Sequence, residues 1–114
     1  MVEGTFDAAH QLVGHDGPCE KLHGHTWKAQ VYIEGVKLNK LGMVMDFKEI
    51  KTMLQYIISG LDHINLNTLA YFKNTNPTSE NIAKYIFDEA AKKIDGITKV
   101  TVFESAITSA SYTR

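Results

Sequence analysis

The segment from His23 to Ile33 alternates between two kinds of side chain, and this alternation is the strongest structural constraint in the sequence. From His25 onward the odd-numbered positions are mostly apolar and the even-numbered positions are mostly polar. Successive side chains of a strand point to opposite faces of a sheet, so the pattern predicts a strand with one buried face. A shorter stretch places Phe6, Ala8 and His10 on one side and predicts a preceding strand.

Two later segments change from the period of a strand to the period of a helix. Asp46 is a favourable N-cap residue with Glu49 in capping-box spacing, and an apolar stripe follows as far as Gly60. A second helix is expected to begin at Thr78 or Ser79 and to end before residues 95–96. The predicted stripe of the first helix comprises Phe47, Ile50, Leu54, Ile57, Ile58 and Leu61.

The remaining segments complete an α+β pattern. Alternation returns over residues 97–106, and residues 108–113 follow as a hairpin partner. Residues 43–45 are expected to form a brief return strand, and residues 62–77 an irregular connection. The order strand-strand-helix-helix-strand-strand predicts a single domain over residues 1–114, with a four-stranded antiparallel sheet and both helices on one face. Open sheet edges favour pairing with other subunits, so we expect a homo-oligomer.

Charge and cysteine content narrow the classes of function. The chain carries 12 Lys and Arg against 13 Asp and Glu, so it has no basic excess and we expect no nucleic-acid partner. No apolar run approaches the ~18 residues of a membrane span, and the first residues lack the features of a secretory signal. Cys19 is the only cysteine, which suits a reducing compartment. These features predict a cytoplasmic protein with no membrane association.

Three histidines have the spacing of metal ligands. His23 and His25 leave the same face of one predicted strand, and His10 is in phase on the other. Three neutral imidazoles with an open position are the arrangement of a catalytic zinc site. The alternative is that the His23 and His25 pair only packs beside Trp27. The third histidine and a nearby cysteine favour the metal.

Cys19 precedes His23 by four residues in a segment rich in Gly and Pro. An adjacent dication would lower the pKa of this thiol from about 8.5 and make a thiolate available near neutrality. Cys19 could instead be a fourth ligand that closes a structural metal site. The two roles give opposite expectations for activity.

Two further positions could carry chemistry. Asp62 precedes His63, and a carboxylate beside an imidazole suits proton transfer near neutral pH. Glu104 interrupts an apolar strand face, where a carboxylate is costly unless something pairs with it. A ligand with two adjacent N–H donors would satisfy both oxygens, as would a neighbouring Lys or Arg.

These residues together resemble the family of 6-pyruvoyltetrahydropterin and 6-carboxytetrahydropterin synthases. The resemblance covers nearly the whole chain. It rests on FDAAH ending at His10, CEKLHGH over residues 19–25, MDF at residues 45–47, LDHINLN over residues 61–67, NPTSENIA from residue 76, and FES around Glu104.

The resemblance implies a homohexamer of the tunnelling fold (T-fold), a dimer of trimers with active sites at subunit interfaces. His10, His23 and His25 would bind Zn²⁺, and Cys19 would be the catalytic base. Asp62 and His63 would complete a proton relay across an interface. Glu104 would anchor the pterin, and the segment Thr78, Ser79 and Glu80 would help to line its pocket.

The implied reaction is the zinc-dependent conversion of 7,8-dihydroneopterin triphosphate to 6-carboxy-5,6,7,8-tetrahydropterin, acetaldehyde and triphosphate, in queuosine (7-deazaguanine) biosynthesis. The three residues between Cys19 and His-Gly-His resemble this carboxy-forming branch, which makes the chain a lyase. Glu20 also resembles members that cleave dihydroneopterins to 6-hydroxymethyldihydropterin for folate synthesis. A pyruvoyl-forming synthase remains an alternative, and a non-catalytic zinc- or pterin-binding module is the alternative from another class.

Overall fold

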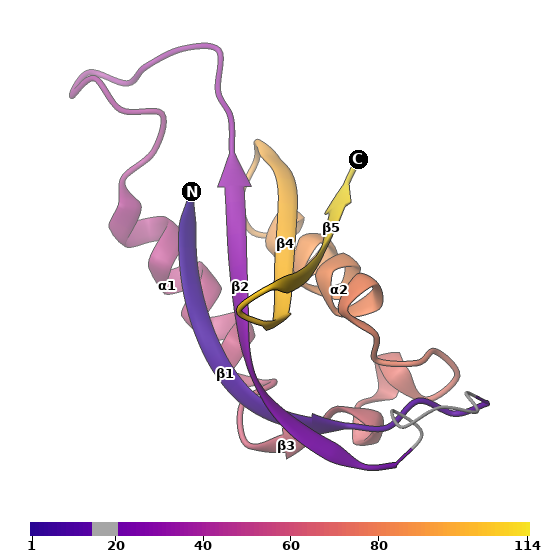
Figure 1. Cartoon of the computed structure of the whole chain (residues 1–114). Helices are drawn as coiled ribbons and strands as arrows, with labels where there is room; N and C mark the ends of the chain where they lie inside the picture. The colour runs from indigo at the N-terminus through magenta and orange to yellow at the C-terminus, as the bar shows by residue number, and fades with distance from the viewer. Residues whose placement is uncertain (15–20) are drawn as a thin grey trace.

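The structure is a computed structural model that describes residues 1–14 and 21–114 (Figure 1). Within these residues the strands make one five-stranded sheet in the spatial order β3-β1-β2-β4-β5. Two α-helices and two short 3₁₀ turns connect the strands. The strands are β1 (Val2–His10), β2 (His23–Ile33), β3 (Ile64–Asn65), β4 (Ile97–Ser105) and β5 (Thr108–Thr113). The helices are α1 (Phe47–Ser59) and α2 (Ser79–Ala91), and the 3₁₀ turns are η2 (Leu66–Thr68) and η3 (Ala70–Phe72).

Strand register brings the two ends of the first hairpin together. β1 pairs antiparallel with β2 along the whole length of β1, with His10 opposite His23 and Ala8 opposite His25. β2 then pairs with β4, and β4 with β5, also antiparallel. The long β1–β2 ribbon curves away from the rest of the sheet toward the end that carries the histidines (Figure 1).

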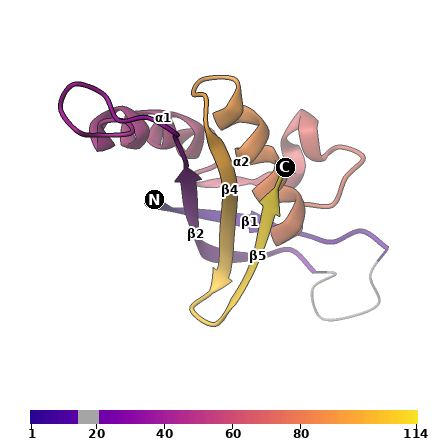
Figure 2. The ribbon, with the colours of Figure 1, turned by 90° about the horizontal axis from the view of Figure 1, so that it is seen from above.

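Both helices cover the same face of the sheet, as expected from their apolar stripes (Figure 2). Helix α1 packs against β1, whereas α2 packs against β4 and β5. Asp46 caps α1 by accepting a hydrogen bond from the backbone N–H of Lys48, and Thr78 caps α2 through Asn81. The fully buried centre of the core comprises Trp27, Ala29, Val31, Leu61, Leu66, Ile82, Ala83, Ile86, Ala90, Val100 and Val102.

The structure corrects three expectations about the elements. The predicted strand at residues 43–45 belongs to a loop, because the side chain of Asn39 accepts hydrogen bonds from the N–H groups of Leu41 and Met43. The backbone of Met43 therefore bonds within the loop instead of joining a ladder. Phe47 was expected in the buried stripe of α1 but is exposed at the helix start.

The third correction concerns the segment expected to be wholly irregular. It contains β3, a two-residue strand that pairs parallel with Ala8 and Ala9 at the outer edge of β1. The described residues therefore form five strands rather than four, with one parallel pair. A strand this short has too few residues to show alternation, so its pairing depends on the tertiary structure.

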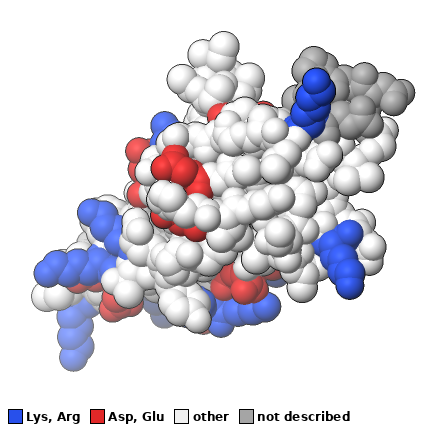
Figure 3. All heavy atoms as spheres, turned by 90° about the horizontal axis from the view of Figure 1, so that it is seen from below, with Lys and Arg blue, Asp and Glu red and all other residues white. Residues whose placement is uncertain are grey.

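On the face shown in Figure 3, basic side chains are spread around the margins and do not gather into one stripe. Among the described residues, no helix combines the length and apolar character required to cross a membrane.

Candidate metal centre and active site

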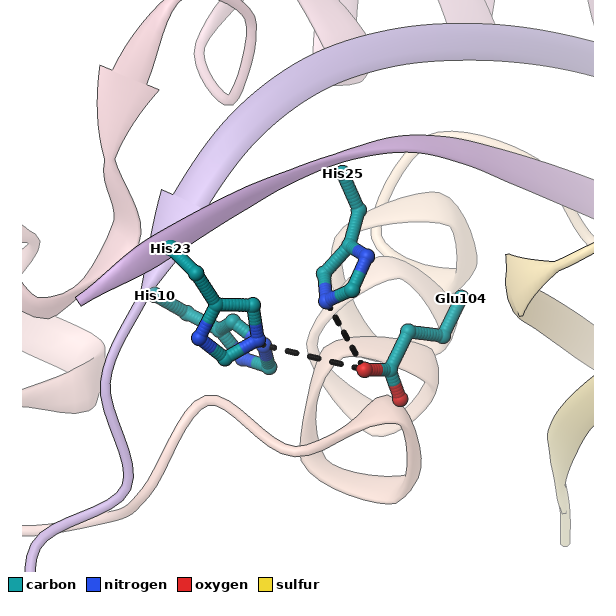
Figure 4. A group of neighbouring side chains, drawn as sticks. All are labelled: His10, His23, His25 and Glu104. Carbon is teal, nitrogen blue, oxygen red and sulfur yellow. Dashed lines mark hydrogen bonds and ion pairs between the residues drawn. The ribbon is translucent and has the colours of Figure 1, made fainter. Parts of the chain in front are cut away.

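The three predicted metal-binding histidines converge at one end of the β1–β2 ribbon (Figure 4). His10 is the last residue of β1, and His23 and His25 begin β2. Their shared strand phase places all three on the face that the helices cover, and the antiparallel register puts His10 directly opposite His23. The juxtaposition inferred from the sequence is therefore present in the folded chain.

Glu104 of β4 completes a cluster of four potential ligands (Figure 4). Each of the four side chains offers a ligand atom, and these atoms all lie within 4.8 Å of one another. The Nε2 atoms of His10 and His23 are 3.1 Å apart. Glu104 Oε1 lies 2.8 Å from His25 Nε2 and 3.9 Å from His10 Nε2. One ion placed among them would contact several donors at once.

Backbone carbonyls determine which nitrogen of two histidines carries the proton. His10 Nδ1 lies 2.8 Å from the carbonyl oxygen of Pro77, and His23 Nδ1 lies 2.7 Å from that of Lys21. A carbonyl can only accept, so each Nδ1 must donate and each neutral ring keeps a lone pair on Nε2. The two lone pairs face each other at 3.1 Å, an arrangement that a cation between them would stabilise.

The ring of His25 also favours a cation in the cluster. Its Nε2 is buried and has no hydrogen-bond partner among the described residues. Glu104 Oε1 is close enough for an ion pair, but the pair does not meet the geometric criteria for a hydrogen bond. A buried polar atom without a partner is costly, and a metal ion in the cluster would satisfy it.

Burial favours the ligating form of His10. The residue is 2% exposed, and burial lowers its pKa, with His23 and His25 acting in the same direction. The hydrogen bond to Pro77 and the charge of Glu104 oppose this shift without reversing it. A lowered pKa keeps the imidazole neutral at physiological pH, which is the form that binds metals.

Trp27 forms a rigid wall beneath the cluster. Its ring meets those of His10 and His25 edge to face, with centroids 4.9 Å and 5.2 Å away. The indole is fully buried and donates its N–H to the carbonyl of Ala8. The sequence left open that the His23 and His25 pair only packs beside Trp27. His25 does pack beside Trp27, and its ring also belongs to the cluster of potential metal ligands.

The donor set fits a transition-metal ion. Three imidazoles with one carboxylate suit zinc, and such sets also bind iron, nickel and copper. The geometry of the described residues thus supports a metal site without selecting the ion.

Asp62 and His63 form a separate pair at the outer edge of β1. Asp62 Oδ2 lies 2.9 Å from His63 Nδ1, and Asp62 Oδ1 accepts a hydrogen bond from the backbone N–H of Asp7. That hydrogen bond, with the one from His63, lowers the pKa of Asp62 despite partial desolvation. His63 has a φ of 58°, and its N–H donates to the carbonyl of Asp7, which fixes the turn before β3.

Within one chain this pair does not join the histidine cluster. With Asp7 it makes a second group of neighbouring ligand atoms, distinct from the group around His10. An open hollow of about 530 Å³ lies beside it, and its lining includes His25, Thr26 and His63. The imidazole of His63 is mostly exposed, so its free nitrogen is accessible to a ligand or to another subunit.

The segment expected to line a pterin pocket lies at the start of α2. Thr78 is the N-cap, Ser79 is the first helical residue, and Glu80 is exposed in the first turn. The link from this segment to the cluster is the preceding residue, Pro77, through its carbonyl. Sequence reasoning did not single out Pro77, because a main-chain acceptor leaves no signal in residue type. Cys19 and Glu20 lie outside the described residues.

Comparisons with known proteins decide the family. Residues 1–114 match the family described as 6-pyruvoyl tetrahydropterin synthase. The chain belongs to this family. Curated relatives of this chain bear the names of pterin-processing enzymes, so the expectation of an enzyme is confirmed.

Individual relatives agree with this assignment. A protein of Synechocystis named 6-carboxy-5,6,7,8-tetrahydropterin synthase is 38% identical over 116 aligned positions, which cover 96% of this chain and 88% of the relative. A Pyrococcus furiosus protein named dihydroneopterin monophosphate aldolase is 40% identical and covers 88% and 81%. The solved structure of 6-pyruvoyl tetrahydropterin synthase from Caenorhabditis elegans superposes with a TM-score of 0.90 at 28% identity, covering 99% and 92%. The T-fold expected from the sequence is confirmed.

Proposed function

We propose that this chain is a zinc-dependent lyase that converts 7,8-dihydroneopterin triphosphate and one water molecule to 6-carboxy-5,6,7,8-tetrahydropterin, acetaldehyde and triphosphate, in queuosine biosynthesis. The observation that carries the metal-dependent part is the convergence of three imidazoles, two of which direct Nδ1 at a backbone carbonyl and bring their Nε2 atoms to 3.1 Å from each other. The choice of the carboxy-forming branch is supported by the name of the Synechocystis relative and by the short spacing from Cys19 to His23.

His10, His23 and His25 would hold the ion in this proposal. A bound Zn²⁺ supplies Lewis-acid polarisation of substrate oxygens, which eases their deprotonation. Trp27 keeps the rings of His10 and His25 in place, and the carbonyls of Pro77 and Lys21 keep two of the Nε2 lone pairs directed inward. The ligands are therefore oriented before the ion arrives.

Glu104 would bind the pterin ring. Its carboxylate is partly exposed beside the cluster, so both oxygens can accept from the two adjacent N–H donors on the 2-amino-4-oxo edge. The same position would allow Glu104 to be a fourth metal ligand when no substrate is present. Thr78, Ser79 and Glu80 would line the far side of the pocket, at the start of α2.

Proton transfer is assigned to Cys19 as base and to the Asp62–His63 pair. The ionised carboxylate of Asp62 holds His63 Nδ1, which leaves the exposed Nε2 of His63 free to exchange protons. Because this pair is separate from the histidine cluster of its own chain, we propose that it serves the cluster of a neighbouring subunit in a homohexamer of two trimers. A sedimentation mass near that of a monomer would contradict this arrangement.

A second candidate is cleavage of a dihydroneopterin to 6-hydroxymethyldihydropterin. It is favoured by the Pyrococcus relative, which is named as an aldolase and is as similar as the carboxy-forming relative. Glu20 also stands where the sequence resembles this class. The two candidate reactions use the same metal site and the same pterin ring of the substrate. They differ in what happens to the substituent at position 6 of the pterin.

Product analysis separates the candidates. Zinc-loaded protein is incubated with 7,8-dihydroneopterin triphosphate and, separately, with the monophosphate, and products are identified by mass spectrometry. Formation of 6-carboxytetrahydropterin with acetaldehyde supports the proposal. A 6-hydroxymethyl product supports the aldolase, and a 6-pyruvoyl product supports the third branch.

Two histidine variants provide matched controls. His23→Ala should lose both zinc and turnover, because it removes a ligand. His63→Ala should lose turnover and keep zinc, because this side chain is outside the cluster. If His63→Ala releases the zinc, the separation of the two groups is wrong.

A further inference from the structure

The backbone that follows β1 is held by two asparagine side chains from another part of the fold. Antiparallel pairing of β1 with β2 ends at His10, opposite His23. Residues 11–13 continue beyond that last pair, where a strand end would ordinarily fray. Asn67 in η2 and Asn76 before α2 contact this stretch instead.

Each asparagine makes a two-way contact with one residue. Asn67 Oδ1 accepts from the N–H of Gln11 at 2.8 Å, and Asn67 Nδ2 donates to the carbonyl of Gln11 at 2.8 Å. Asn76 makes the same pair of bonds with Val13, at 2.9 Å and 3.0 Å. A side-chain amide thereby supplies the donor and the acceptor that a neighbouring strand would supply. We call Asn67 and Asn76 the amide clamp.

The clamp is connected to the ring of His10 on its other side. The carbonyl of Asn76 accepts from the N–H of Thr78 and from Asn81 Nδ2, which fixes the turn around Pro77. Pro77 is fully buried, and its carbonyl is the acceptor for His10 Nδ1. Asn76 therefore ties the backbone that leaves His10 to the turn that orients the His10 imidazole.

We propose that Asn67 and Asn76 are positioning residues that hold His10 ready to bind the metal. This inference rests on the proposed metal site and adds to it the residues that hold one ligand in place. Loss of an outer partner of a ligating histidine typically costs 10–100-fold in metal affinity. Because the clamp acts through the backbone and through Pro77, each single change should fall near the lower end of that range.

The test measures zinc affinity of the full chain by competition with a chromogenic chelator, after removal of metal with EDTA. Asn67→Ala and Asn76→Ala should each raise the dissociation constant for zinc about tenfold. Asn39→Ala is the matched control, since Asn39 also makes two side-chain bonds to backbone N–H groups but in the loop before α1. It should leave zinc affinity unchanged.

A second variant and a spectroscopic signal guard against simple loss of folding. Asn76→Asp keeps an acceptor for the N–H of Val13 but sets a carboxylate oxygen against its carbonyl, so it should weaken zinc binding at least as much as Asn76→Ala. In the metal-free protein, the His10 Nδ1 proton should exchange with water faster in the clamp variants than in wild type, as followed by NMR.

The outcomes distinguish failure of the positioning role from failure of the proposed metal site. Folded clamp variants that bind zinc as tightly as wild type would overturn the positioning role and leave the metal site intact. A wild-type chain that binds no zinc would overturn the proposed function itself. A purely structural role would lower the melting temperature of the variants without changing zinc affinity or proton exchange, and would also overturn the inference.

Discussion

Replacing His25 with Phe should make the metal-free protein more stable and remove its stabilisation by zinc. His25 Nε2 is buried and makes no hydrogen bond among the described residues, although Glu104 Oε1 lies 2.8 Å away in ion-pair range, and the ring packs against Trp27. Leaving a buried polar atom unsatisfied costs about 1–3 kcal/mol, whereas a phenyl ring has no such atom and keeps the edge-to-face packing. We expect a gain of about 1 kcal/mol, since part of the gain is lost when Glu104 gives up its neighbour.

Thermal unfolding measures both halves of this prediction. For a chain of 114 residues, an unfolding entropy of about 2.1 cal/mol/K per residue converts 1 kcal/mol into a shift of about 4 °C. In EDTA the variant should therefore melt about 4 °C above wild type. With zinc at about 100 times its dissociation constant, wild type gains about 2.7 kcal/mol and should melt above the variant.

The diagnostic result is that His25→Phe melts above wild type in EDTA and below wild type with zinc. The matched control is His63→Phe, because His63 lies outside the cluster. Loss of its contact with Asp62 and the positive φ at this position should lower both melting temperatures alike, so this variant should melt below wild type in both conditions. If His25→Phe is less stable than wild type in EDTA, the imidazole is satisfied in the metal-free protein and the argument from the orphaned atom is wrong.

Three further predictions concern single groups of the site. Burial lowers the pKa of His10, so the unfolded chain binds a proton more readily, and the free energy of unfolding of the metal-free protein should fall as the pH drops below about 6.5. Urea midpoints at about pH 7.5 and 5.5 measure this fall, which His10→Asn should diminish; an unchanged slope would contradict it. Cys19→Ala should abolish turnover while elemental analysis still finds zinc, and loss of zinc would make Cys19 a ligand instead of a base. Glu104→Gln should raise the dissociation constant for the pterin without removing zinc, measured by ligand titration, and an unaltered pterin affinity would exclude the anchor.

Local sequence signals predicted most of the elements because those elements depend on local chemistry. The alternation after His23 became β2, the segment expected over residues 97–106 became β4 (Ile97–Ser105), and residues 108–113 became β5. Asp46 and Thr78 cap α1 and α2 at the expected positions. A periodic stripe and a capping side chain act over a few residues, so their signal is contained in the segment itself.

The errors arose where contacts distant in the sequence outweigh local preference. β3 exists because residues 64 and 65 meet the edge of β1, which no local pattern encodes. Apolar residues at positions 43–45 suggested a strand, but Asn39 folds that segment on itself. Phe47 fits the period of α1 and is nevertheless exposed, at the first residue of the helix.

Part of the candidate site could likewise be predicted from the sequence, and part depends on the tertiary structure. Residue type and strand phase were sufficient to group His10, His23 and His25, since period-two alternation determines which side chains share a face. Strand phase carries no information about which ring nitrogen is protonated. That was decided by the carbonyls of Pro77 and Lys21.

By itself the sequence determined the family, the main strands and helices, and the three histidines, because each of these is written in residue identity at short spacing. Only the tertiary structure decided that Glu104 meets His25, that Asn67 and Asn76 hold the chain beyond His10, and that Asp62 and His63 stay apart from the cluster. Those contacts join segments tens of residues apart. Their geometry is set by the packing of β1, β2, β4 and α2 around one core, and local preference has no access to it.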